Sequence, residues 1–175
     1  HTLTEPGSGY AYRYTKSVRL VKNQPVMMIE HVLQNTGKRV IATRVYNHNF
    51  LNINGAGTRA GLALRAPFAL ITDQPPDPRL AEIAGNRLTY MGVPGHDQRV
   101  TARFTGFGRA ATDYDFHITD RSSGAGLRIS GDQPLDRLVL WSIGPVMSIE
   151  PFLNMTIPAG GSFRWSYRYT FETAD

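Results

Sequence analysis

The chain has 175 residues, of which 41% are hydrophobic and 19% charged, so it is long enough for one domain with a sizeable core. No apolar run approaches the about 20 residues of a membrane helix, and the absence of cysteine excludes disulfides, thiolate catalysis and cysteine-ligated zinc. The net charge of +5 comes with arginines scattered singly along the chain, so we expect a solvated basic surface and no nucleic-acid or membrane partner.

The first part of the chain is predicted to form three strands. At residues 9–21 tyrosines alternate with polar residues, and this period of two is typical of a strand. Residues 26–33 form the next apolar run, and the asparagine and glycine within residues 34–38 suit a hairpin turn. A third strand is expected at residues 38–47, with His48 at its far end. We predict that these three strands form a meander.

The rest of the chain is predicted to consist of short strands joined by turns. Residues 61–71 are apolar but interrupted by Pro67. Residues 73–78 contain three prolines and are expected to form an exposed loop, because proline cannot take part in a central ladder. Residues 79–84 suit either a strand or one helical turn. Strand-like alternation continues at residues 87–91, 99–107, 114–119, 126–130, 135–143, 146–153 and 162–172.

The spacing of these strand-like segments predicts the fold class. No window of about 11 residues shows a helical stripe, and the strands are short and closely spaced. We therefore predict an all-β fold, a large antiparallel β-sandwich with few or no helices, formed as a single domain by residues 1–175. Residues 162–172 carry five aromatics on one parity, which would bury a large area in a core or line a concave sheet.

His48 is the first candidate for chemistry. It lies between Asn47 and Asn49, with Tyr46 and Phe50 nearby, in a segment rich in hydrogen-bonding groups. An imidazole held in one tautomer there could donate or accept a proton near neutral pH. The alternative is a structural histidine that bonds to loop backbone.

Glu150 is the second candidate. It stands between Ile149 and Pro151 in an apolar strand, where partial desolvation would raise the pKa of its carboxyl group toward the range useful to a general base. The alternative is a glutamate paired with one of the many arginines.

The remaining histidines give weaker signals. His31 lies beside Glu30 in the middle of a strand and is expected to point to solvent or to pair locally. His96 lies in a loop at residues 93–97, and His117 lies in a strand. No local spacing predicts a metal site, and no cofactor is implied.

Two stretches carry a resemblance to a known family. Residues 46–51, which contain His48, and residues 148–152, which contain Glu150, are similar to segments of the galactose mutarotase-like (aldose 1-epimerase-like) superfamily. Residues 157–165 resemble the turn and closing strand that follow in that family. The chain thus looks like the later part of such a domain.

The resemblance implies a large antiparallel sandwich that acts on sugars. It implies that Glu150 removes the proton of the anomeric hydroxyl and that His48 donates a proton to the ring oxygen, so that the two anomers interconvert. The acid and the base would stand on opposite sides of one hemiacetal, in a shared sugar-sized cleft. The candidates for substrate binding are Asn47, Asn49, Tyr46, Trp141 and His96.

The chain also departs from the family pattern. An upstream region of the family supplies further strands, an arginine and another histidine, and no matching segment precedes residue 9. Either a missing N-terminal segment of the same protein acts as a partner, or the site is reduced. The alternative function is a non-catalytic carbohydrate-binding or structural sandwich, because this fold also occurs in that role.

The sequence does not distinguish between cellular compartments. We expect a soluble protein, either cytoplasmic or exported. Neither the lack of cysteine nor a start at His1, which a signal peptide could precede, distinguishes the two.

Overall fold

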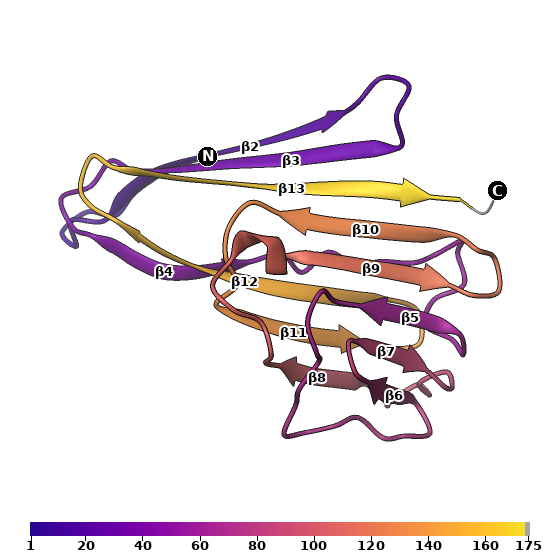
Figure 1. The fold of residues 1–175 in the computed structure, drawn as a ribbon. Coiled ribbons are helices and arrows are strands. Elements are labelled where there is room, and N and C mark those ends of the chain that lie inside the picture. Colours follow the sequence, from indigo (N-terminus) through magenta and orange to yellow (C-terminus); the bar gives the residue numbers. More distant parts are fainter. Residues whose placement is uncertain (174–175) are drawn as a thin grey trace.

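The computed structural model describes residues 1–173, which fold into two antiparallel sheets stacked as layers (Figure 1). The larger sheet contains, in spatial order, β1 (Thr2–Thr4), β2 (Ala11–Leu20), β3 (Val26–Asn35), β13 (Ser162–Glu172), β10 (Gly126–Gly131), β9 (Asp115–Asp120), β5 (Leu62–Arg65), β7 (Arg87–Tyr90) and β6 (Ala81–Ala84). The smaller sheet contains β4 (Ile41–Tyr46), β12 (Met147–Ile157), β11 (Arg137–Ser142) and β8 (Val100–Phe104).

The predicted all-β fold class is confirmed. Among the described residues the one helical element is a 3₁₀ turn at Ala111–Asp113, and none forms a helix that could cross a membrane. Residues 79–84, for which strand and helical turn were both open, form strand β6.

The core lies between the two sheets, and it follows the period of two in each strand. Along β12 the odd-numbered residues face the larger sheet and are buried, whereas the even-numbered residues lie on the outer face of the smaller sheet. From β13, Trp165, Tyr167 and Tyr169 fill the opposite side of the core. The aromatic parity of residues 162–172 therefore marks a core face, although Phe171 at its end is 45% exposed.

The predicted meander of the first three strands is wrong. Strand β3 pairs with β2 and β13, whereas the chain then leaves the larger sheet and β4 pairs with β12 in the smaller one. Buried Asn35 stabilises the connection between β3 and β4, because its side-chain amide donates to the carbonyl oxygens of Arg39 (2.7 Å) and Ile157 (2.9 Å). At Gly37 a Cβ would stand 2.5 Å from the backbone nitrogen of Ala11, so the close approach requires glycine.

The predicted exposure of His31 is also wrong. Its Nδ1 lies 2.6 Å from the Tyr14 hydroxyl, and its ring stacks on Trp165 at 4.7 Å between centroids. Alternation along β3 places His31 on the same face as buried Ile29 and Asn35, whereas Glu30 takes the exposed one. Burial, with a smaller effect from Lys16, lowers the pKa of His31 to about 4.

This buried imidazole predicts a loss of stability in mild acid. The unfolded chain takes up a proton near pH 6.5, whereas the folded chain resists it until about pH 4, so the stability is complete above pH 6.5 and is lost between these values. We expect the free energy of unfolding from urea titrations to be about 2–3 kcal/mol lower at pH 4.5 than at pH 7 from this group. His31→Gln should lack that part of the decline. An equal decline in both proteins would contradict the prediction.

Candidate active site

His48 and Glu150 meet because of the register between β4 and β12. The pairing that sets Tyr46 opposite Phe152 continues past the end of β4 to the bridge between Leu51 and Met147. The same register places His48 opposite Glu150. Cross-strand partners project from the same face of a sheet, so both side chains lie on the outer face of the smaller sheet.

The two side chains are in direct contact through His48 Nδ1 and Glu150 Oε1. The carboxylate lies deep, with its side chain 9% exposed, whereas the imidazole is 40% exposed. Burial raises the pKa of the Glu150 carboxyl group above its usual value, and the charge and hydrogen bond of His48 oppose this rise. The pair therefore combines a partly desolvated carboxylate with an accessible imidazole.

Aromatic rings surround the imidazole on this face. Tyr46 stacks on Phe152 with centroids 4.2 Å apart, and the His48 ring makes edge contacts with Phe50 at 4.8 Å and with Trp141 at 5.4 Å. These contacts restrict the orientation of the ring. They also form an apolar surface next to a polar pair, a combination typical of small-molecule sites.

Asn47 and Asn49 point away from this face. The Asn49 side-chain amide donates to the hydroxyl of Tyr169, and Asn47 also hydrogen-bonds that hydroxyl. Tyr169 belongs to β13 in the other sheet and is buried. The structure thus gives the two asparagines an anchoring contact with Tyr169, on the opposite side of the extended segment from His48.

The structure gives His96 and His117 other acidic partners than Glu150. His96, predicted to bind substrate, has a 98% exposed side chain and contacts the carboxylate of Asp97 at 2.9 Å. His117 lies near Asp115 and Glu172, at 3.8 and 4.0 Å. Within residues 1–173 no group of three histidine, aspartate or glutamate residues is arranged to hold a metal ion.

The segment that follows His48 is tied down by a buried ion pair. Arg59 Nη2 lies 2.5 Å from the carboxylate of fully buried Asp120 in β9, and Arg59 Nη1 donates to the carbonyl oxygens of Ile53 and Gly57. Burial alone would raise the pKa of Asp120, but hydrogen bonds from Ser123, Ser122 and Arg59 outweigh it and hold this pKa well below its usual range. Residues 47–59 are therefore fixed to both sheets.

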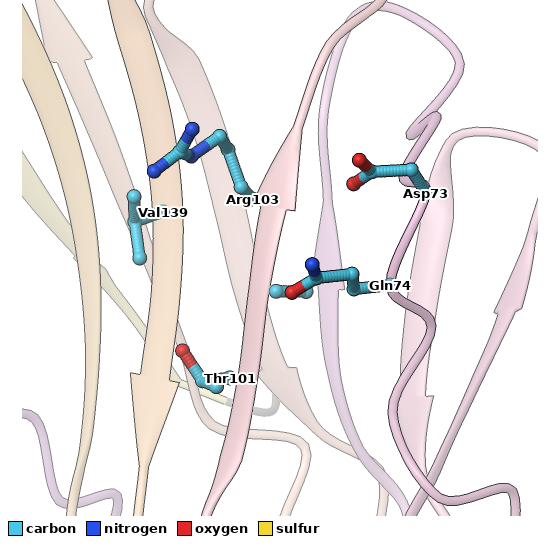
Figure 2. Close-up of a pocket in the computed structure, with 6 residues that line it drawn as sticks. Asp73, Gln74, Thr101, Arg103 and Val139 are labelled. Atoms are coloured by element: carbon cyan, nitrogen blue, oxygen red, sulfur yellow. The ribbon is translucent and has the colours of Figure 1, made fainter.

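A second feature on the same face was not predicted from the sequence. Asp73, Gln74, Thr101, Arg103 and Val139 line a hollow of about 250 Å³ together with Ala102 (Figure 2). Val139 is the cross-strand neighbour of both Arg103 and Glu150, so the hollow adjoins the His48–Glu150 pair. Residues 73–78 were predicted only as an exposed loop, because their position depends on a distant bridge between Ile71 and Thr105.

Comparison with solved structures identifies the fold. A candidate aldose 1-epimerase from Klebsiella pneumoniae superposes with a TM-score of 0.73 at 15% identity, over 97% of this chain and 48% of its own. A candidate aldose 1-epimerase from Escherichia coli K12 gives 0.71 at 12% identity, over 99% and 64%. A galactose mutarotase-like protein from Clostridium acetobutylicum gives 0.67 at 14% identity, over 99% and 61%.

The chain spans between about half and two thirds of the length of these neighbours. No protein-family model matches the sequence, and a search of curated proteins finds no match. At such low identity the similarity establishes the fold alone. The chain thus has the antiparallel β-sandwich fold of the galactose mutarotase-like superfamily, as its resemblance in residues 46–51 and 148–152 predicted.

Proposed function

We propose that the protein interconverts sugar anomers by acid–base catalysis, with Glu150 as the base and His48 as the acid. The observation that carries this proposal is the direct contact between an accessible imidazole and a partly desolvated carboxylate on one sheet face. The names of the structural neighbours, candidate aldose 1-epimerases and a mutarotase-like protein, support the same class of reaction.

The contact suits the chemistry of a hemiacetal. The anomeric hydroxyl and the ring oxygen are bonded to the same carbon, so an acid and a base that reach them from one side must themselves be neighbours. The sequence interpretation had placed the two groups on opposite sides of the sugar. An arrangement on one side is the one that this contact supports.

The proposed reaction uses the pair in its ionised form. Glu150 removes the proton of the anomeric hydroxyl, His48 donates a proton to the ring oxygen, and the bond between that oxygen and the anomeric carbon breaks. The product is an open-chain aldehyde beside a neutral pair. Rotation of the aldehyde and the reverse proton transfers close the ring as the other anomer and restore the ion pair.

A sugar-binding protein without catalysis is the second candidate. The observation in its favour is the exposed aromatic surface around His48, where Phe50 is 58% and Tyr46 is 43% exposed. Aromatic faces of this kind stack on the apolar faces of sugar rings. This alternative predicts binding that survives replacement of Glu150 and weakens when Trp141 or Phe50 is replaced by alanine, with no acceleration of mutarotation.

The pH dependence of mutarotation tests the proposal. We expect the purified protein to accelerate anomer exchange of glucose, galactose or lactose, measured by polarimetry from a freshly dissolved single anomer. Because the folded pKa of Glu150 is raised, the base becomes protonated early as pH falls, and the catalysed rate should decline at a higher pH than an ordinary glutamate would give. Acceleration of none of these sugars between pH 5 and 8 would refute catalysis on them.

A further inference from the structure

The hollow beside Glu150 and the His48–Glu150 pair belong to one row of residues across the outer face of the smaller sheet. Arg103 in β8 is the partner of Val139 in β11, and Val139 is the partner of Glu150 in β12. Glu150 in turn contacts His48. The row runs perpendicular to the strands, so a ligand lying along it would touch all four positions.

A segment outside the sheet extends this row. At the free edge of β8, Ile71 and Thr105 exchange backbone hydrogen bonds of 2.8 and 3.3 Å. Two residues further along, the same antiparallel pairing brings Asp73 beside Arg103, and both line the hollow. Figure 2 shows the side chains of Asp73 and Gln74 directed toward the strand that carries Thr101 and Arg103.

The spacing of the row sets the size of the ligand. Neighbouring strands are about 4.8 Å apart, so Arg103 stands about 10 Å from Glu150 and Asp73 about 14 Å. One pyranose ring held by His48 and Glu150 does not extend that far, whereas a disaccharide does. The volume of about 250 Å³ is just below the range of about 300–1,000 Å³ typical of small-molecule pockets, and it suits a single ring.

The lining defines the chemistry of the group. Arg103 supplies donors, Asp73 supplies acceptors, and Gln74 supplies both. Within residues 1–173, neither Arg103 nor Asp73 has an ion-pair or side-chain hydrogen-bond partner, so their polar atoms are free for a ligand. A cation and an anion in one small hollow match a neutral group with several hydroxyls better than a phosphate, since Asp73 would repel a dianion.

We propose that this hollow is a subsite for the second sugar unit of a reducing disaccharide whose reducing ring lies over His48 and Glu150. This inference rests on the proposed function, and it names the substrate class. Asp73, Gln74 and Arg103 hold the non-reacting unit by hydrogen bonds and thereby raise the affinity for disaccharides over free hexoses.

The test compares substrates and variants by polarimetry. The substrates are glucose, galactose, lactose, maltose and glucose 6-phosphate, and the proteins are the wild type, Gln74→Ala, Asp73→Asn and the matched control Gln24→Ala, which lies in the remote β2–β3 turn. We expect each hollow variant to lose about five- to tenfold in kcat/KM for lactose or maltose, mainly through KM, and less than about twofold for the hexoses. The control should match the wild type.

Several outcomes would overturn the inference and leave the proposed function intact. These are a wild type with no preference for disaccharides, variants that affect hexoses and disaccharides equally, or a preference for glucose 6-phosphate. If the protein accelerates mutarotation of none of the sugars, the subsite is tested separately by measuring lactose binding in an NMR titration. Lactose binding that weakens in Gln74→Ala but not in Gln24→Ala supports the subsite, and unchanged binding refutes it.

Discussion

Glu150→Gln is expected to reduce catalysed mutarotation by a factor of at least about 100, because removal of a positioned general base typically costs 10²–10⁴-fold. Glutamine keeps the shape of the side chain and can still hydrogen-bond His48, but it cannot accept the proton of the anomeric hydroxyl. The loss should appear in kcat more than in KM, measured by polarimetry on the wild-type protein's best substrate.

Stability distinguishes loss of the base from loss of the fold in this variant. Since burial raises the pKa of Glu150, ionising this carboxyl group costs more free energy in the folded chain than in the unfolded chain, and glutamine should leave the free energy of unfolding unchanged or higher. Glu82→Gln is a suitable control, because this residue is exposed on β6, the edge strand of the larger sheet, whereas Glu150 lies in the smaller sheet. A Glu150→Gln protein that keeps full activity would contradict the assignment of Glu150 as the base.

Asp120→Ala is expected to lower the free energy of unfolding by about 3–5 kcal/mol, the usual cost of removing one partner from a buried ion pair. The mutation leaves Arg59 without its carboxylate and Ser122 and Ser123 without their common acceptor. Urea titration at pH 7 measures the loss. Because the pKa of Asp120 is held low, the stability that it contributes is present at neutral pH and fades only below about pH 4.

The same variant should also weaken catalysis, since Arg59 fixes residues 47–59 and this segment carries His48. We expect kcat to fall even under conditions in which the variant is fully folded. Asp77→Ala removes an exposed ion pair with Arg79 and serves as the control, with no measurable change in activity. Equal stability of the Asp120→Ala and Asp77→Ala proteins would contradict the anchoring role.

The period of two in the sequence was enough to locate most strands, including the long β12 and β13. The pairing partners were harder to predict, because they depend on residues far apart in the chain. Ile41–Tyr46 is an extended segment in either topology, and only its pairing with residues 152–157 places β4 in the smaller sheet. The exposure predicted for His31 was wrong for a related reason, since its ring is covered by Tyr14 from β2 and Trp165 from β13, which are distant in the sequence.

The candidate site was predictable to the extent that its residues are unusual in their local context. Glu150 stands out as a carboxylate in an apolar strand, and His48 as an imidazole between two asparagines. Asp73 and Arg103 do not stand out, because a charged residue in a loop or on an exposed strand position is ordinary. Their proximity arises from the bridge at the edge of β8, which no local pattern signals.

The alignment of Arg103, Val139, Glu150 and His48 has a consequence for how such a chain can vary. Adding or deleting a single residue inside β11 or β12, or between Tyr46 and His48, would turn the following side chains to the opposite face. A carboxylate or an imidazole would then enter the apolar interior. Homologues that keep this chemistry should therefore differ in length within the loops and keep the residue spacing of these strands, even where the side chains between the reacting pair are exchanged.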